Sequence, residues 1–140
     1  MFRKVILALD GSDCAMQAAE AALGLAAEQE ASLYVLSVIE HMPHYAATVG
    51  ESEEEYERAT AYFQGVQQPV LDRAAELGVA AEGKIAVGNP PQVIVHATEE
   101  PGTDLLVIGH SGHSGAWGRF LGTTVDKVAR HAHCSVLIVR

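Results

Sequence analysis

The sequence predicts one α/β domain, in which a parallel sheet is covered by helices on both faces. Short apolar runs alternate with segments whose apolar residues recur at helical spacing, and this alternation is typical of strands joined by crossover helices. The chain has 140 residues, of which 49% are hydrophobic. That composition is enough for one compact core and leaves no room for a second domain of ordinary size.

The apolar runs predict five strands, which cover residues 4–9, 32–39, 79–87, 104–108 and 134–139. The first run ends in Asp10-Gly11-Ser12, which predicts a turn with Ser12 as the N-cap of a helix. An alanine-rich face follows at helical spacing and predicts close packing on the sheet. Its members are Ala15, Ala18, Ala19, Ala22, Leu23 and Ala26.

Three further helices are expected, over residues 51–78, 90–100 and 123–132. The first of these begins with an acidic run, which suits the positive end of a helix dipole and indicates a solvated face. Pro69 lies inside it and predicts a kink or a break, while the aperiodic residues 41–50 before it predict a loop. The last helix is expected to bury one stripe, made of Val125, Val128, Ala129 and Ala132.

The charge and the cysteines narrow the class of protein. The net charge is −9 and no segment concentrates lysine or arginine, which disfavours binding to a nucleic acid. No apolar stretch approaches the roughly 20 residues of a membrane span, so no membrane insertion is expected. The first residues lack a signal-peptide pattern, and Cys14 and Cys134 form no disulfide framework and are read as small buried hydrophobes. We therefore expect a cytoplasmic protein.

The strongest functional signal is a glycine-rich segment after the fourth apolar run. Gly109 and Gly112 are followed by Gly122 and Thr123, at the start of the last expected helix. Glycines let a ligand approach the backbone closely, and a helix N-terminus favours anions, so the segment predicts a cradle for phosphates. The alternative is a surface turn without a ligand. If the first and fourth strands are neighbours, Asp10 and Gly109 flank one crevice at the carboxyl ends of the strands.

These residues resemble the universal stress protein family over essentially the whole chain. The opening Val-Ile-Leu-Ala-Leu-Asp-Gly-Ser is similar to the first strand and aspartate turn of the family. The glycine spacing is similar to the G-x2-G-x9-G signature, followed by Ser or Thr, of its ATP-binding branch. The segment Ala132-His133-Cys134-Ser135-Val136-Leu137-Ile138-Val139 is similar to its closing helix and edge strand. The resemblance implies a Rossmann-like sheet of order 3-2-1-4-5 and a homodimer joined through residues 134–140.

The resemblance also implies ATP, or a related adenine nucleotide, with accompanying Mg²⁺ or Mn²⁺. Asp10 is then expected near the ribose and adenine, the Val38 backbone at the adenine, and Thr123 near the phosphates and the metal. The full set of candidate nucleotide-binding residues is Ala8, Asp10, Val38, Gly109, His110, Gly112, His113, Gly122, Thr123 and Thr124. Two positions depart from the pattern: Ala8 stands where proline is frequent, and His113 stands where a basic residue is frequent. Arg119 can compensate for the second departure.

The leading hypothesis is a nucleotide-responsive regulator, with an unknown regulatory protein as its partner. The chain lacks the G-x-x-x-x-G-K phosphate loop and an obvious general base, so no catalytic residue is assigned and fast turnover is not expected. A slow metal-dependent ATPase, a nucleotide-free dimeric interaction module and an AMP or cyclic AMP binder remain alternatives. The seven histidines show no grouping typical of a structural zinc site.

Overall fold

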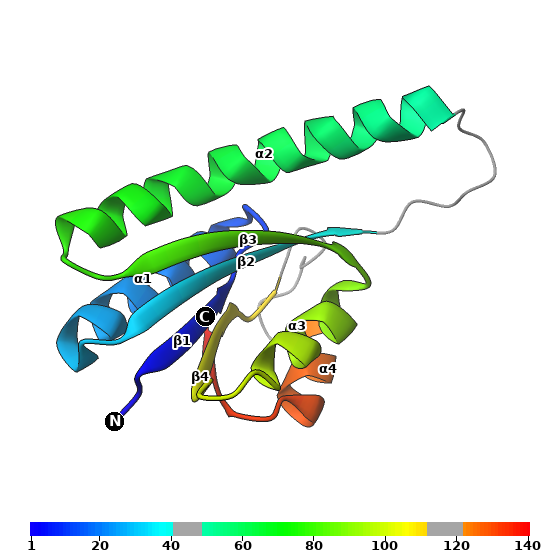
Figure 1. The fold of residues 1–140 in the computed structure, drawn as a ribbon. Coiled ribbons are helices and arrows are strands. Elements are labelled where there is room, and N and C mark those ends of the chain that lie inside the picture. Colours follow the sequence, from blue (N-terminus) through cyan, green and yellow to red (C-terminus); the bar gives the residue numbers. More distant parts are fainter. Residues whose placement is uncertain (41–48, 112–121) are drawn as a thin grey trace.

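The computed structural model describes residues 1–40, 49–111 and 122–140, and it has the expected five-stranded parallel sheet (Figure 1). The strands are β1 (Lys4–Ala8), β2 (Ser32–Glu40), β3 (Ala81–Gly88), β4 (Leu105–Gly109) and β5 (Ser135–Val139). They lie in the order β3-β2-β1-β4-β5, and each neighbouring pair is parallel. The order implied by the family resemblance is confirmed.

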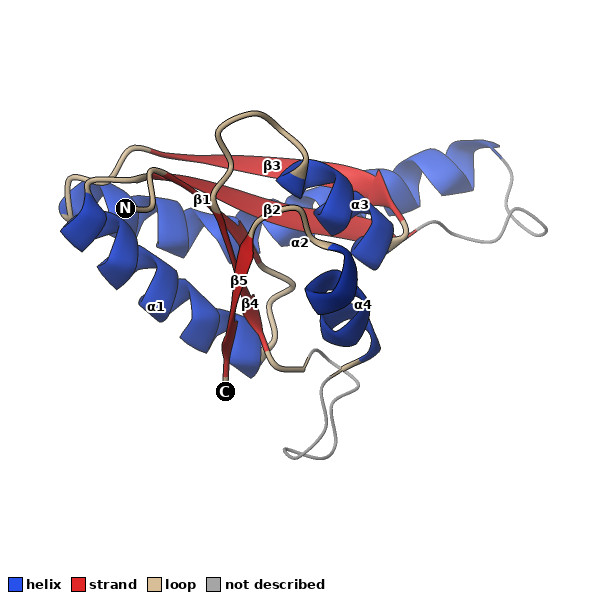
Figure 2. Ribbon diagram, turned by 90° about the horizontal axis from the view of Figure 1, so that it is seen from below, coloured by secondary structure: helices blue, strands red, loops and turns tan. Residues whose placement is uncertain are grey.

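Helices cover both faces of the sheet, as Figure 2 shows from below. The helices are α1 (Asp13–Gln29), α2 (Val49–Glu76), α3 (Pro90–Thr98) and α4 (Thr123–His131). Because side chains alternate along a strand, Val5 and Leu7 of β1 join the core under α1 and α2, whereas Ile6 joins the core under α3 and α4. The sheet is therefore buried on both sides, which explains the continuous apolar runs of its central strands.

Helix α1 has the start and the face that the sequence predicts. The Ser12 hydroxyl oxygen accepts a hydrogen bond from the Ala15 N–H at 3.2 Å, so Ser12 is the N-cap. All six members of the alanine-rich face are buried. Small side chains on this face let the helix backbone approach β4 closely, and that approach matters at the carboxyl end of the strand.

Three details of the helices differ from expectation. Helix α2 begins at Val49, inside the segment expected as a loop, and it continues through Pro69 without a break. Proline removes only one hydrogen bond there, and the buried Val70 and Ala74 pack the second half of the helix on the sheet. Ala129 is exposed and not part of a buried stripe, because the short helix α4 buries only Val125 and Val128. The other residues of the expected loop, 41–48, lie outside the described residues.

The exposed side chains of α2 and the apolar character of the helices can be compared with what the sequence predicts. The side chains of Glu53, Glu54, Glu55 and Glu57 are exposed, which confirms a solvated acidic face at the start of α2. None of the helices in the described ranges combines the length and the apolar character needed to cross a bilayer.

Candidate functional site

The turn after β1 is stabilised by its own side chains. Asp10 Oδ1 accepts a hydrogen bond from the Ser12 N–H at 2.9 Å, which closes an Asx-type turn before α1 begins. Gly11 has a φ of +87°, a conformation that favours glycine, and an added Cβ would lie 2.8 Å from the Tyr62 hydroxyl oxygen. Helix α2 therefore packs over this turn, and the positive φ favours glycine there.

The end of β4 lies beside the end of β1, as the crevice hypothesis requires. Leu7 of β1 is paired with Val107 of β4, so Asp10 and His110 both follow the same edge of the sheet. The His110 N–H donates to the Val139 carbonyl at 2.8 Å, and the His110 carbonyl accepts from the Gly122 N–H at 2.9 Å. One residue thus joins the ends of β4 and β5 to the start of α4.

Gly109 is required by packing. A Cβ at this position would lie 2.7 Å from the carbonyl carbon and 2.8 Å from the carbonyl oxygen of Cys14, in the first turn of α1. The Cys14 Sγ lies 3.4 Å from His110 Nδ1 and 3.5 Å from the Ser111 hydroxyl oxygen. Close contact between α1 and the end of β4 therefore explains the first glycine of the motif without a ligand.

Gly122 differs from Gly109, because nothing in its backbone requires glycine. It is the N-cap of α4, with φ −62° and ψ 158°, a conformation open to any residue. Serine, threonine, aspartate or asparagine would be favoured there, yet the helix has no side-chain cap. The first N–H groups of α4, which begin at Thr123 and Thr124, are consequently left without an acceptor from the N-cap side chain.

A buried polar link that the sequence analysis missed holds the end of β1. The Ser37 hydroxyl donates to the Leu9 carbonyl at 2.6 Å and accepts from Gln67 Nε2 at 2.9 Å. Ser37 and Gln67 are both buried, at 1% and 4% exposure. The chain of contacts therefore runs from α2 through β2 to the residue just before Asp10. The local signal for it is Ser37, a small polar residue in the middle of the apolar run 32–39.

The remaining candidate residues are distributed as follows. Ala8 is buried and Val38 is half-buried, and both belong to the core under α3 and α4. Thr123 is exposed and Thr124 is half-buried at the start of α4. Gly112 and His113, together with Arg119, lie outside the described residues. The structure thus brings the ends of β1 and β4 and the start of α4 together, while the middle of the glycine-rich segment stays a prediction.

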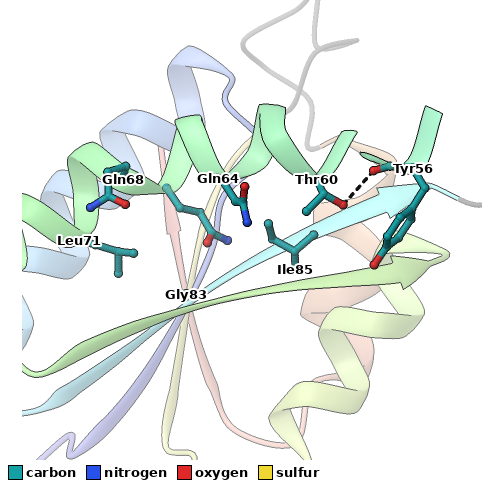
Figure 3. A pocket seen from close by; sticks show the side chains of 8 residues that line it. Tyr56, Thr60, Gln64, Gln68, Leu71, Gly83 and Ile85 are labelled. Atoms are coloured by element: carbon teal, nitrogen blue, oxygen red, sulfur yellow. Dashed lines mark hydrogen bonds between the residues drawn. The ribbon is translucent and has the colours of Figure 1, made fainter. Parts of the chain in front are cut away.

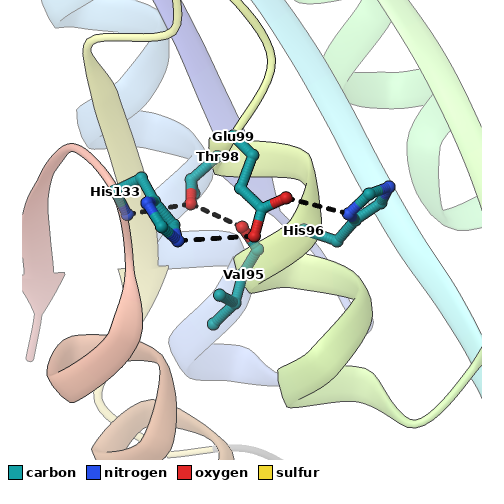
Figure 4. Close-up of polar contacts among 5 residues, drawn as sticks. All are labelled: Val95, His96, Thr98, Glu99 and His133. Atoms are coloured by element: carbon teal, nitrogen blue, oxygen red, sulfur yellow. Dashed lines mark hydrogen bonds and ion pairs between the residues drawn. The ribbon is translucent and has the colours of Figure 1, made fainter.

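The described histidines and cysteines do not form a metal centre. Within residues 1–40, 49–111 and 122–140, no three His, Cys, Asp or Glu side chains are grouped to hold a metal ion. His133 and His96 instead lie on either side of Glu99, at 3.3 Å and 3.2 Å from its two carboxylate oxygens (Figure 4). Both cysteines are half-buried free thiols rather than fully buried hydrophobes. Burial, followed by the charge of Asp104, raises the pKa of the Cys134 thiol.

The chain folds as an open, doubly wound α/β domain, in which the turns after β1 and β4 follow the carboxyl ends of neighbouring strands. A family model described as "Universal stress protein family" matches residues 1–140, and the chain belongs to that family. It is 34% identical to universal stress protein YxiE of Bacillus subtilis over 153 aligned residues, with both chains fully covered.

Solved structures agree with this assignment. UspA of Lactobacillus plantarum superimposes with a TM-score of 0.82 at 24% identity, covering 99% of this chain and 98% of that one. A second universal stress protein gives 0.75 at 29% identity, with coverage of 99% and 97%. The first likeness concerns the fold alone.

Proposed function

We propose that this chain binds an adenine nucleotide at the carboxyl ends of β1 and β4, and that occupancy of this site is a regulatory signal. The phosphates would lie against the glycine-rich segment and the N-terminus of α4, with Gly109 and Gly122 at its two ends. Asp10, Ala8 and Val38 would lie on the ribose and adenine side. The universal stress protein that is 29% identical was solved in complex with cAMP, which supports a ligand of this class.

The observation that carries the proposal is the uncapped start of α4. The N-cap position of α4 is occupied by glycine, Gly122, although the backbone conformation there is open to every residue and a side-chain cap would stabilise the helix. A phosphate is a suitable acceptor for the N–H groups that remain, because the helix dipole also favours an anion there. The absence of a Cβ keeps this backbone accessible.

ATP with Mg²⁺ or Mn²⁺ is the ligand that the glycine signature favours. The residues present fit such a group, since α4 supplies N–H donors and the Thr123 hydroxyl is an oxygen ligand of the kind that Mg²⁺ accepts. The metal would neutralise phosphate charge in a chain whose own net charge is −9. AMP or cyclic AMP is the alternative ligand, and slow metal-dependent hydrolysis of ATP is the alternative activity.

A homodimer through β5 would connect the site to its signal. β5 is an edge of the sheet, and Leu137 in it is 37% exposed. The hydrogen bonds of His110 join β5 to the start of α4, so a ligand that orders α4 can bias pairing at this edge or the binding of a regulatory protein in the cytoplasm. The alternative is a nucleotide-free dimeric module, in which the β5 edge pairs without any ligand at the carboxyl ends of the strands.

The first test is native mass spectrometry of the gently purified protein, followed by calorimetric titration with Mg·ATP, AMP and cAMP. We expect one adenine nucleotide per chain, and we expect loss of binding in Gly122→Val. Gly24→Val is the matched control, because an added Cβ at Gly24 meets nothing within 4 Å. A folded protein that binds none of the three nucleotides contradicts the proposal and favours the nucleotide-free module.

A further inference from the structure

A second surface lies at the β3 edge of the sheet, under α2. A groove with a volume of about 370 Å³ runs between α2 and β3, as Figure 3 shows. Gly83 and Ile85 of β3 form one side. The helix side carries hydroxyl and amide groups from Tyr56, Thr60, Gln64 and Gln68. The groove thus has a polar helix side above a short stretch of β3, and its volume suits the binding of a few side chains.

The strand under this groove is an open edge of the sheet. Among the described residues, β3 pairs with β2 alone. The Leu33 N–H donates to the Ala80 carbonyl at 2.8 Å, so that carbonyl faces β2. Because backbone groups alternate in direction along a strand, the N–H and C=O groups of Gly83, Ile85 and Val87 face outward. An edge of this kind is a template for another strand.

The edge carries two exposed charged side chains, Glu82 and Lys84, but it is long and regular. β3 is eight residues long, contains no proline, and follows β2 without a break in register from Ala81 to Gly88. Gln67 fills the space over Gly83, where an added Cβ would overlap its side-chain oxygen. Its Nε2 group donates to the Lys84 carbonyl at 3.1 Å. These contacts hold β3 against α2.

Acidic side chains flank the groove. Glu53 precedes Tyr56 by three residues and Glu57 precedes Thr60 by three, so both carboxylates lie near the groove face of α2. Asp72 accepts a hydrogen bond from the Gln68 amide at 2.8 Å at the other end. The residues that line the groove include no lysine or arginine. From Glu57 to Asp72 the helix rises about 22 Å, the length of roughly seven extended residues.

We propose that the groove between α2 and β3 binds an extended segment of another protein, which adds to the sheet beside β3 and carries a basic side chain near each end. Every second side chain of the added strand would point into the space under α2, where the Thr60 hydroxyl and the Gln64 amide offer hydrogen bonds. A second copy of this chain is a poorer occupant, because two β3 edges would bring like carboxylates together.

The probe is a capped heptapeptide, acetyl-Lys-Val-Thr-Val-Thr-Val-Lys-amide, added to ¹⁵N-labelled full-length protein at low ionic strength. We expect an alternating pattern, in which the outward amides of Gly83, Ile85 and Val87 shift more than the inward amides of Glu82, Lys84 and Ala86. The same peptide with glutamate at both ends should bind more weakly, by about fivefold at most, because it lacks two surface ion pairs.

Two variants separate strand addition from attraction of charge. Val87→Pro removes an outward N–H without removing a bond to β2 and should abolish the alternating shifts, whereas Val87→Thr should retain them. Glu57→Lys should remove the preference for the lysine-ended peptide. Glu55→Lys makes the same charge change on the opposite side of α2 and should leave the preference intact.

Three results would overturn the proposal. The first is no shift in β3 amides with the lysine-ended peptide at millimolar concentration. The second is shifts confined to the acidic face of α2, which would indicate attraction of charge without a strand. The third is a concentration-dependent shift of the β3 amides without peptide, which would assign this edge to a second copy of the chain. If Val87→Pro does not fold, the presence or absence of the alternating amide shifts in the wild-type protein still decides strand addition, and the comparison of Glu57→Lys with Glu55→Lys still tests the charge preference.

Discussion

Helices α1 and α4 begin at the same edge of the sheet, and their N-termini are built in opposite ways. At α1, Ser12 caps the helix with its hydroxyl oxygen and Asp10 accepts from the Ser12 N–H, so the turn satisfies its own donors. At α4 the N-cap is Gly122, which has no side chain to accept from the first N–H groups. Helix α1 therefore has a side-chain cap at its N-terminus, whereas the N-cap of helix α4 provides none.

The difference indicates which of the two turns is stabilised for the fold and which is kept for a ligand. A cap typically contributes about 1 kcal/mol, so a helix that forgoes one loses stability that another contact can restore. Gly109 and Gly122 differ in the same way, since Gly109 is fixed by close packing, whereas the φ and ψ of Gly122 are open to any residue. The following predictions test this contrast, from the largest effect to the smallest.

Gly109→Ala should have the largest effect on stability. Its Cβ would lie 2.7 Å from the Cys14 carbonyl carbon and 3.0 Å from the Ala15 nitrogen, so the first turn of α1 would have to move. We expect the free energy of unfolding to fall by about 3 kcal/mol, the upper range for overpacking a buried site. Urea denaturation followed by circular dichroism measures it.

Gly24→Ala is the matched control for that measurement. Gly24 lies inside α1 and an added Cβ meets nothing within 4 Å. Alanine should therefore raise the free energy of unfolding by about 0.5–1 kcal/mol, because it restricts the unfolded chain and favours the helix. Equal effects of the two substitutions would mean that Gly109 is not fixed by its contact with α1.

Gly122→Asp should exchange ligand affinity for stability. The side-chain carboxylate can accept from the N–H groups of α4 and should raise the free energy of unfolding by a few tenths of a kcal/mol. It would then occupy the place proposed for phosphate, and we expect nucleotide affinity to fall about tenfold or more. Gly122→Asn adds the same cap without the charge and separates electrostatic repulsion from occupation of the site. Unchanged affinity in both variants, measured by calorimetry, would contradict a phosphate at this terminus.

Ser12→Ala tests the other side of the contrast. It removes the acceptor for the Ala15 N–H, and we expect a loss of about 1 kcal/mol in the free energy of unfolding with nucleotide affinity nearly unchanged. Ser12→Thr is the conservative control, since it keeps an acceptor oxygen. A large loss of affinity in Ser12→Ala, with stability unaffected, would show that this turn also contacts the ligand.

The cap of α1 was readable from the sequence, whereas the reason for each glycine was not. Ser12 followed by Asp13 is a local signal, and its hydrogen bond lies within four residues. The motif marks Gly109 and Gly122 alike, but only the approach of α1 to β4 shows that Gly109 is required by packing. Such a contact joins residues almost a hundred positions apart, and no local pattern encodes it.

The fold was predictable for a related reason. The prediction was wrong where tertiary packing decides the outcome. Apolar runs located all five strands within about two residues, because burial on both faces requires continuous hydrophobicity. The continuity of α2 through Pro69 and the exposure of Ala129 depend on which side of a helix meets the sheet. The Ser37–Gln67 link to Leu9 likewise needs three elements in place at once.

Glu100→Gln should have the smallest effect. It removes a contribution to the free energy of unfolding that depends on pH in the acid range, and this contribution arises near the amino ends of β1 and β4. Lys4 Nζ of β1 donates to the Glu100 carboxylate at 3.1 Å, and this hydrogen bond, followed by the lysine charge, lowers the pKa of Glu100 from its ordinary value of 4.5. The folded pKa lies below the unfolded one, so the stabilisation is present above pH 4.5 and is lost as the pH falls through the folded value. The variant should be slightly less stable than the wild type at pH 7, and the two should converge in acid. Urea midpoints at pH 7, 5 and 3 measure this, with Glu82→Gln as the same substitution on the exposed surface of β3. A difference in stability that stays constant at all three pH values would show that the ion pair does not cause it. Comparisons of the α1 and α4 turns in acid would then need no correction for this ion pair.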